Sequence, residues 1–425
     1  MAEAQPDPMD SGAADAALTW DAFASWLTSS GAIEGASAVT SVEPLSVGFS
    51  NENYVVRVAL DDGDGGERRP TFVVRTPPPP PGLLEPYDLE VQFRTMSALA
   101  DSGVPVPGMI CYEPSADILG RPFLLMDFVA GSNFELDEPE WVSAGNDGLF
   151  RGMASAAIRT LAGIHAADPS SLGDVESSSA SVAPRREVDR WVEIMRAADP
   201  RTLSAFEGVV DWLTDNAPSP MGRPSIMHGD FKLGNLMWRP DPQAPEVVGV
   251  MDWEMGGVGD PRTDLAYYLT VTYDVMADCA LAKGLDRDEA IALYEASSEQ
   301  DVGDLRWFEV LAAFKLAVIY RIMYARFAQR ATDDLRFFVI GRGTPEMLGL
   351  AQARAGLADA PADRADYEPE RKRVAEACAA ALRDMVIPAI DGDAARMQGS
   401  LLLPAVDFLA GQSTASSVGP LSERN

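Results

Sequence analysis

Two short stretches decide the fold: HGDFKLGN at His228–Asn235 and VMDWE at Val250–Glu254. The first places Asp230 five residues before Asn235, and the second places Asp252 at the end of an apolar run. The turn within the first stretch brings Asp230 and Asn235 to the same side of one loop. The strand-like residues on both sides of the loop are the context in which such a loop presents its polar side chains.

These residue types fit the transfer of a phosphoryl group. Asp230 can accept a hydrogen bond from a hydroxyl and take its proton as a P–O bond forms. Asn235 and Asp252 offer hard oxygen ligands for Mg²⁺, which neutralises charge between phosphates. Lys232 is close enough in sequence to reach the transferred phosphate. The order and spacing are typical of the phosphoryl-transfer site of the kinase fold.

Upstream of this site, the pattern predicts a β-rich lobe. Its strands are rich in Val, Phe and Tyr. The run PPPPP at 77–81 excludes helix and central strand and ends the first part of the sheet. Apolar residues at helical spacing predict one helix after this run. The predicted strands are Val42–Val47, Asn53–Leu60, Thr71–Arg75 and Pro122–Val129, and the predicted helices are Trp20–Leu27 and Tyr87–Ala100.

Downstream, the pattern becomes helical. Helices are predicted at Phe150–Ala166, at Glu187–Ala198 and from Leu265 onward, around an irregular Ser225–Trp238 and a strand at Val247–Met251. This predicts an α+β, bilobal, protein kinase-like fold with a small antiparallel N-lobe and a larger helical C-lobe. We expect a disordered acidic tail (1–18), a nucleotide-binding lobe (19–130), a helical lobe (131–360) and a helical extension with a disordered end (361–425).

Composition excludes several functional classes. The 425 residues include 34 basic and 65 acidic ones, for a net charge of −31, which argues against nucleic acid and anionic membranes as partners. The acidity favours simple solubility over attraction of a cationic ligand. Three distant cysteines and two histidines make a disulfide framework or structural zinc site improbable. No apolar run reaches membrane-spanning length, and the start is no secretory signal, so we expect a cytoplasmic protein. The sequence leaves open whether it is a monomer or a homodimer.

The sequence resembles the aminoglycoside phosphotransferase and choline kinase superfamily, in the branch that includes the kinase-like domains fused to some acyl-CoA dehydrogenases. The segments that carry the resemblance lie in family order between residues 42 and 270. They are VGFSNENYVVRV, FVVRTPPP, GVPVPGMICYE, GRPFLLMDFVAG, LAGIHAADP, REVDRW, MHGDFKLGNLMW and VMDWEMGGVGDPRTDLAYYL. The last two are the most specific.

The resemblance implies ATP and Mg²⁺ as cofactors and assigns roles by position. Asp230 matches the catalytic base, with Lys232 on the phosphate, and Asn235 with Asp252 matches the metal ligands. Arg75 matches the basic residue that pairs with phosphates on the third strand, which an arginine can do bidentately. The short phosphate loop corresponds to Gly48, Phe49, Ser50 and Asn51, and the adenine-binding hinge to Met126, Asp127, Phe128 and Val129.

One position departs from the family pattern. The family helix usually supplies a Glu to the basic residue of the third strand, but here the matching position is Gln92, with Glu90 two residues earlier. At 100° per residue Gln92 lies near the apolar face of its helix, while Glu90 points away from it. We therefore expect Gln92 to meet Arg75 through a neutral hydrogen bond, unless a rotated helix brings Glu90 there instead.

Several neighbouring residues are expected to give structural support. His228 is expected to orient the loop, His165 to be structural, and Asp260 and Asp264 to hold the catalytic loop and cap the next helix. Glu254 either extends the metal shell or is an exposed carboxylate.

The leading hypothesis is a kinase that transfers the γ-phosphate of ATP to the hydroxyl of an aminoglycoside-like, choline-like or hydroxyacyl substrate. The alternative is a pseudokinase that acts as a nucleotide-binding or scaffold module. The single-glycine loop and Gln92 favour the alternative slightly, whereas the intact set of Asp230, Asn235 and Asp252 favours the enzyme.

Overall fold

The computed structural model describes residues 18–45, 50–61, 67–135, 138–172, 184–220, 223–332 and 334–357. The chain forms two units, the first from Met1–Arg186 and Pro218–Phe308 and the second from Glu187–Ala217 and Glu309–Asn425. The lobe boundary predicted at residue 130 falls inside the first unit. The predicted extension 361–425 and all but the last residue of the predicted tail 1–18 lie outside the described residues.

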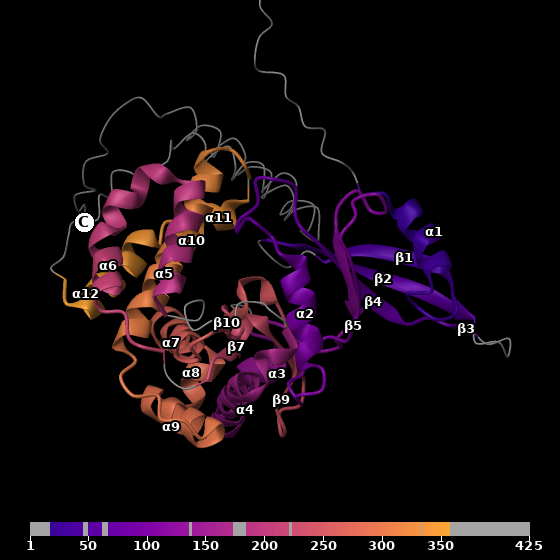
Figure 1. Cartoon of the computed structure of the whole chain (residues 1–425). Coiled ribbons are helices and arrows are strands. Elements are labelled where there is room, and N and C mark those ends of the chain that lie inside the picture. Colours follow the sequence, from indigo (N-terminus) through magenta and orange to yellow (C-terminus); the bar gives the residue numbers. More distant parts are fainter. Residues whose placement is uncertain are drawn as a thin grey trace, which may run out of the picture. The chain divides into compact units, whose positions relative to one another are not determined.

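The N-terminal part of the first unit contains an antiparallel sheet, which Figure 1 shows beside helix α1 (Trp20–Ser30). Its strands run in the order β1-β2-β4-β6-β5, with β3 paired to β2, and every pairing is antiparallel. The strands are β1 (Ala36–Leu45), β2 (Glu52–Asp61), β3 (Glu67–Arg68), β4 (Thr71–Thr76), β5 (Met109–Glu113) and β6 (Phe123–Asp127). A β-rich N-terminal part followed by helices confirms the predicted α+β, kinase-like fold class.

Two edges of this sheet differ from the prediction. Strand β1 begins at Ala36, six residues before the predicted start, and β5 was not predicted at all. Every residue of β5 is only partly buried, and the first half of β1, Ala36 to Thr40, consists mostly of small residues. Edge strands of this kind lack the apolar alternation that identifies a strand in sequence, because only one side of them pairs and packs.

Side-chain alternation along the sheet separates two packed faces. On one face, Phe23 and Leu27 of α1 (Trp20–Ser30) pack with a cluster that includes Phe72, Val74 and Phe123. The other face meets α2 (Leu89–Leu99), whose Leu89, Met96 and Leu99 share a second cluster with Leu124. Arg75 is one residue past Val74 in β4, so it lies on the α2 face.

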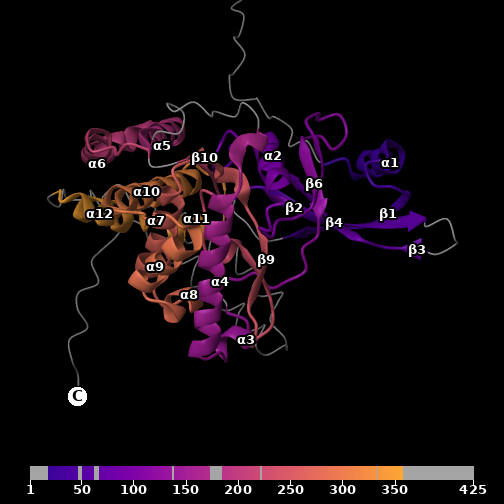
Figure 2. The ribbon, with the colours of Figure 1, turned by 60° about the horizontal axis from the view of Figure 1, so that its bottom comes forward.

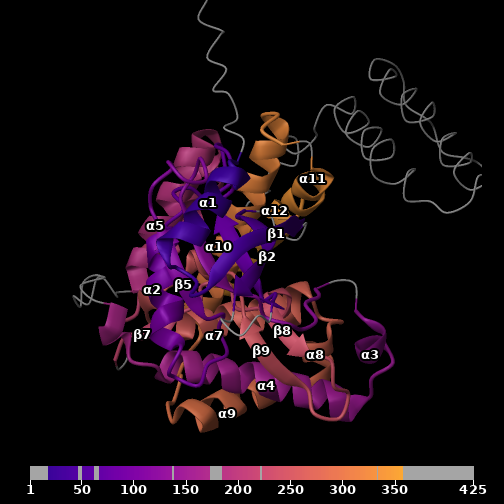
Figure 3. The same ribbon diagram turned by 90° about the vertical axis from the view of Figure 1, so that its right-hand side faces the viewer.

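The helical part of the first unit surrounds α4 (Asp147–Ala166), which packs against α8 (Ala280–Gly284) and α9 (Arg287–Ser298) (Figure 3). Strand β9 (Glu246–Val250) also lies beside α4 (Figure 2). The other elements of this part are α3 (Glu140–Ser143), η1 (Pro169–Leu172), β7 (Ser225–Met227), η3 (Leu233–Asn235), β8 (Leu236–Arg239), η4 (Trp253–Met255), β10 (Gly257–Gly259), α7 (Arg262–Thr270) and the π-helical turn η5 (Val271–Val275).

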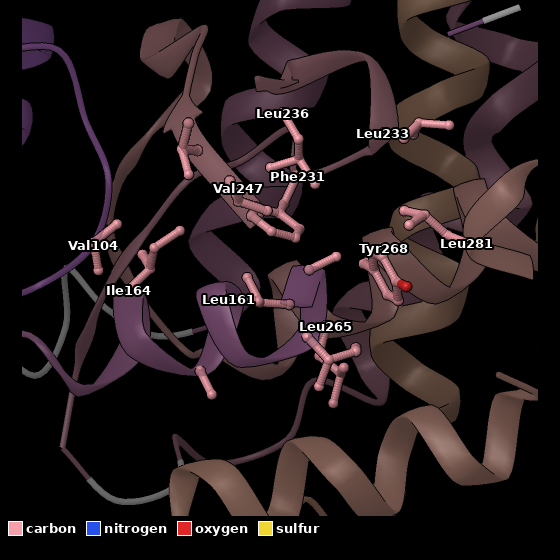
Figure 4. Close-up of a cluster of buried hydrophobic side chains, with 14 of the residues drawn as sticks. Val104, Leu161, Ile164, Phe231, Leu233, Leu236, Val247, Leu265, Tyr268 and Leu281 are labelled. Atoms are coloured by element: carbon pink, nitrogen blue, oxygen red, sulfur yellow. The ribbon is translucent and has the colours of Figure 1, made fainter. Parts of the chain in front are cut away.

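A buried apolar cluster anchors the site loops to this scaffold. Phe231 and Leu233 of the predicted catalytic loop pack with Leu161 and Ile164 of α4 and with Tyr268 of α7 (Figure 4). The stretch predicted to be irregular therefore consists of two short strands, β7 and β8, with this anchored loop between them. Phe231 and Leu233 alternate with the polar residues of the loop and hold its backbone in place, because burying each of these side chains contributes on the order of 2 kcal/mol.

The second unit is helical. It contains η2 (Pro200–Thr202), α6 (Leu203–Asp215), α11 (Leu335–Gly341), α12 (Thr344–Ala355) and most of α5 (Pro184–Ala198) and α10 (Arg306–Ala328). Helices α6 and α12 pack together, and the buried carboxylate of Asp199 accepts a 2.6 Å hydrogen bond from Arg321. Among the described residues, no helix is long and apolar enough to cross a membrane.

Candidate active site

The loop between β7 and β8 holds Asp230 in one orientation. The residue is 8% exposed, and the hydroxyl of Tyr267, from α7, donates to its Oδ1 at 2.6 Å. The Nδ2 of Asn235 donates to the other carboxylate oxygen at 2.9 Å and to the backbone carbonyl of Asp230 at 2.8 Å. Both carboxylate oxygens thus accept a hydrogen bond, and each keeps a lone pair for one more donor.

Asn235 and Asp252 are brought together by backbone pairing. The carbonyl of Asn235 accepts a 2.8 Å hydrogen bond from the N–H of Met251, which directly precedes Asp252. Because Nδ2 of Asn235 donates to Asp230, its Oδ1 faces away from that residue, and no described residue donates to it, so it can serve as an oxygen ligand. Asp252 has φ +67°, an uncommon left-handed conformation for a residue other than glycine, which sets the direction of its carboxylate.

These two residues fit a Mg²⁺ ion. They contribute one amide oxygen and one carboxylate, and the described residues contain no group of three or more His, Cys, Asp or Glu able to hold a metal. Mg²⁺ is usually held by one or two carboxylates, with water and substrate phosphates as its other ligands. The buried Oδ1 of Asn51 also has no hydrogen-bond partner in the described part of the chain, which leaves an unused oxygen in the same unit.

Asp264 ties the catalytic loop to α7. Its buried carboxylate accepts hydrogen bonds from the backbone N–H groups of His228 at 2.6 Å and Gly229 at 2.9 Å. The Nε2 of His165 lies 3.3 Å from the same carboxylate, and its Nδ1 lies 2.6 Å from the hydroxyl of Tyr294. Asp264 therefore holds the loop as predicted, and His165 is structural. Asp260 accepts the backbone N–H of Arg262, the first residue of α7, at 3.1 Å, and it also pairs with the guanidinium of Arg262 at 2.6 Å, so it supports the start of this helix as expected.

His228 connects the two motifs. The carbonyl of Met251 can only accept, so the 2.8 Å contact places the proton of His228 on Nε2, and Nδ1 accepts the N–H of Asp230 at 3.1 Å. Burial lowers the pKa of His228 below its ordinary value, although nearby aspartates oppose this shift. A neutral imidazole that uses both nitrogens for backbone contacts orients the loop and takes no part in proton transfer.

Lys232 is held by a residue from outside its motif. Its Nζ lies 2.9 Å from the carboxylate of Glu135 and 4.0 Å from that of Asp230. Burial alone would lower the pKa of Lys232, but these two carboxylates raise it above the ordinary value. Lys232 is thus a charged group beside Asp230, and Glu135 sets its position.

Arg75 contacts the metal-site residues and not helix α2. Its guanidinium donates to Asp252, and its Nη2 lies 3.7 Å from Glu254. Burial would raise the pKa of Asp252, but Arg75 holds it below the ordinary value. The predicted hydrogen bond from Gln92 is absent, because neither polar atom of its buried side chain has a partner in the described chain. Glu90 pairs with Arg94 on the surface of α2.

The phosphate loop is only partly described, since Gly48 and Phe49 lie outside the described residues. Ser50 and Asn51 both donate to the carboxylate of Glu254, at 2.5 and 2.6 Å. Glu254 is therefore not the exposed carboxylate considered above, because its side chain is only 8% exposed. Burial and the nearby Asp252 raise the pKa of Glu254 above its ordinary value.

The predicted hinge offers one backbone donor. The N–H of Asp127 is bonded to the carbonyl of Gly108, and that of Phe128 to the carbonyl of Thr71. The N–H of Val129 has no partner within the described residues, so it is free to donate to a bound ligand. Met126 is buried in the sheet.

Three residues of this site were missed or left open by the sequence analysis: Tyr267, Glu135 and Glu254. Tyr267 lies inside the segment VMDWEMGGVGDPRTDLAYYL, which carried the family resemblance. Its position in that segment was therefore a signal that could have marked it as a site residue. Glu135 lies in a segment with no recognisable motif, and nothing in the sequence links it to Lys232.

Residues 41–299 match the sequence profile of the phosphotransferase enzyme family. The chain belongs to this family. Mouse acyl-CoA dehydrogenase family member 10 is 31% identical over 229 residues, which cover 50% of the present chain and 21% of that protein. Rat acyl-CoA dehydrogenase family member 11 is 26% identical over 337 residues, 74% of the chain and 42% of that protein. The chain thus spans less than half of these relatives.

The fold has a close counterpart among solved structures. A candidate aminoglycoside phosphotransferase from Ralstonia eutropha superposes with a TM-score of 0.62, at 22% identity, over 80% of the present chain and 98% of its own. At this identity the likeness concerns the fold, and it leaves the acceptor open. The family match supports a kinase-type phosphotransferase.

Proposed function

We propose that this phosphotransferase moves the γ-phosphate of ATP to a hydroxyl group of a small molecule, with Mg²⁺ as cofactor. The observation that carries the proposal is the joint placement of Asp230 and Asn235 beside Asp252. A carboxylate fixed by two donors next to a pair of hard oxygen ligands is what phosphoryl transfer requires, because catalysis there is mainly positioning and electrostatics.

Each residue has one part in the proposed reaction. Asp230 accepts the hydrogen bond of the acceptor hydroxyl and takes its proton as the new P–O bond forms and the bond to the β-phosphate oxygen breaks. Lys232 and Arg75 place positive charge on the phosphate oxygens. Asn235 and Asp252 would hold Mg²⁺, which when bound neutralises charge on the β- and γ-phosphates. The products are a phosphate monoester and ADP, and Asp230 then returns its proton to solvent.

Three acceptor classes remain in the proposal: aminoglycoside-like, choline-like and hydroxyacyl compounds. The names of the curated relatives favour hydroxyacyl thioesters, since those proteins carry an acyl-CoA dehydrogenase name. The acidic composition would suit a cationic acceptor but does not require one.

The test is phosphate transfer from ATP across a panel of these acceptors, in Mg²⁺ and in EDTA. We expect turnover with at least one class, only in Mg²⁺, and a loss of more than a hundredfold in Asp252→Ala. The matched control is Asp241→Ala, a partly exposed aspartate between β8 and β9, which should keep full turnover. A wild-type protein that binds no nucleotide even with Mg²⁺ would exclude the enzyme.

A second candidate is a pseudokinase that binds nucleotide without turnover. The observation that favours it is the side chain of Gln92, which is buried without a hydrogen-bond partner in the described residues and leaves Arg75 to Asp252. Tight Mg·ATP binding with no turnover on any acceptor class, and no ATP hydrolysis, would identify this candidate.

A further inference from the structure

Glu135 follows a segment that is fastened to the catalytic loop. Three residues before it, Ser132 pairs with Trp238 through two backbone hydrogen bonds of 2.8 and 2.9 Å. The side-chain amide of Asn133 donates to the carbonyl of Gly234 at 2.6 Å. The backbone before Glu135 is therefore held beside the loop, and it places this glutamate independently of the contacts that its own side chain makes.

The carboxylate of Glu135 fits closely against the loop. A Cβ at position 234 would lie 2.8 Å from its Oε2, so the glycine there leaves the room that the carboxylate occupies. The other oxygen, Oε1, lies 2.9 Å from the Nζ of Lys232. The side chains of Glu135 and Lys232 are 35% and 22% exposed, so this ion pair is open to molecules in solution.

Lys232 lies near two carboxylates. Among the described residues, those of Glu135 and Asp230 lie within 4.0 Å of its Nζ. The 2.9 Å contact with Glu135 is a charge-assisted hydrogen bond, whereas the 4.0 Å distance to Oδ2 of Asp230 is too long for one. The same Oδ2 accepts a hydrogen bond from Asn235 and keeps one lone pair. Lys232 and an acceptor hydroxyl can both use that lone pair.

We propose that Glu135 keeps Lys232 off Asp230, an inference that rests on the proposed function. Held by Glu135, the ammonium leaves the lone pair of Asp230 to the acceptor hydroxyl and stays available to the phosphate. Without the charge of Glu135, Nζ has to move by only about 1 Å on its flexible chain to reach hydrogen-bond distance of Asp230. Glu135 acts through Lys232 and is therefore a positioning residue.

The experiment compares phosphate transfer by wild type, Glu135→Gln, Lys232→Met and the double variant, with Mg·ATP and the acceptor of the panel above that wild type turns over fastest. Glutamine keeps the size of the side chain, but its neutral oxygen holds an ammonium less strongly than the carboxylate of Asp230 does. We expect Glu135→Gln to lower kcat/KM for the acceptor about tenfold and to change the KM for ATP by less than about twofold. In the Lys232→Met background, which lacks the ammonium, the same substitution should change kcat/KM by less than about twofold.

A matched control and a second readout accompany the kinetics. Glu138→Gln makes the same substitution in a nearby ion pair, 3.6 Å from Lys283, and should leave both constants unchanged. A crystal structure of Glu135→Gln does not depend on turnover, and we expect it to show Nζ of Lys232 within about 3.2 Å of Asp230.

The outcomes separate this inference from the proposed function. An equal fall in kcat/KM with and without the lysine would give Glu135 a purely structural role and overturn the inference, as would a variant structure in which Lys232 keeps its wild-type distance from Asp230. Wild type without turnover on any acceptor overturns the proposed function, and the variant structure then still decides the inference. Circular dichroism checks the fold, and Glu135→Ala, for which we expect the same shift of Lys232, is used if the glutamine variant does not fold.

Discussion

Replacing Asp264 with asparagine tests how the catalytic loop is held in place. In the wild type, the buried carboxylate accepts the N–H groups of His228 and Gly229 at 2.6 and 2.9 Å. An asparagine of the same shape has one acceptor oxygen, so its NH₂ group must face one of the two N–H donors. That donor is then buried without a partner, whereas the other keeps a weaker, uncharged hydrogen bond.

The magnitude follows from these two contacts. A buried donor that loses its acceptor costs about 1–3 kcal/mol, and exchanging a charged acceptor for a neutral one costs about 1 kcal/mol more. We therefore expect the free energy of unfolding of Asp264→Asn to fall by about 2–4 kcal/mol. We also expect kcat to fall, because the same N–H groups position the loop that carries Asp230.

The assay is urea unfolding followed by tryptophan fluorescence and far-ultraviolet circular dichroism. Trp253 lies with its ring 4.6 Å from that of His228, so fluorescence reports on this loop. The control is Asp274→Asn, a partly exposed aspartate 3.8 Å from Arg287, which should change stability by less than about 1 kcal/mol. If Asp264→Asn unfolds within about 0.5 kcal/mol of wild type, its hydrogen bonds do not hold the loop.

Three further predictions follow from individual contacts. Tyr267→Phe removes the 2.6 Å hydrogen bond to Asp230. In steady-state kinetics it should lower kcat about tenfold or more with little change in the KM for ATP. An unchanged kcat would contradict a positioning role for Tyr267. Gly229 has φ +84°, and Gly229→Ala would place a Cβ 2.1 Å from the carbonyl oxygen of Met255, so the free energy of unfolding measured in urea should fall by several kcal/mol. Gly257→Ala, which has open space around its Cβ, should lower it by about 1 kcal/mol or less. Burial lowers the pKa of His228, so its own contribution to stability should fall as the pH falls through 6.5, whereas the raised pKa of Glu254 acts in the opposite direction. In urea unfolding, the stability advantage of wild type over His228→Gln should therefore be smaller at pH 5.5 than at pH 7.5, and an equal advantage at both pH values would show that the folded protein accepts this proton.

Much of the fold was predictable from the sequence because its signals are local. The apolar runs of β2, β4 and β6 and the helical spacing in α2 and α4 depend on neighbours within a few residues. The edge strand β5 was missed because a partly buried edge leaves no alternation in the sequence. The motif His228–Asn235 was predictable because it is local as well: Asp230 and Asn235 pair within a single turn of the chain.

The contacts of Arg75 show where local reasoning ends. Helical geometry placed Gln92 on the correct, buried face of α2, but it could not tell whether that face reaches the guanidinium. Arg75 instead meets Asp252, 177 positions away, because the ends of β4 and β9 come together in the folded unit. Contacts of this range depend on how sheets and helices pack, which residue spacing does not encode.

By itself, the sequence determined the α+β kinase-like class, the loop with Asp230 and Asn235, and the strand that delivers Asp252. Each of these depends on spacing along a short stretch of chain. Only the tertiary structure decided that Tyr267 fixes Asp230, that Glu135 holds Lys232 and that Glu254 collects the donors of the phosphate loop. Those partners come from separate elements, and a buried polar group takes whichever donor or acceptor the packing brings within reach.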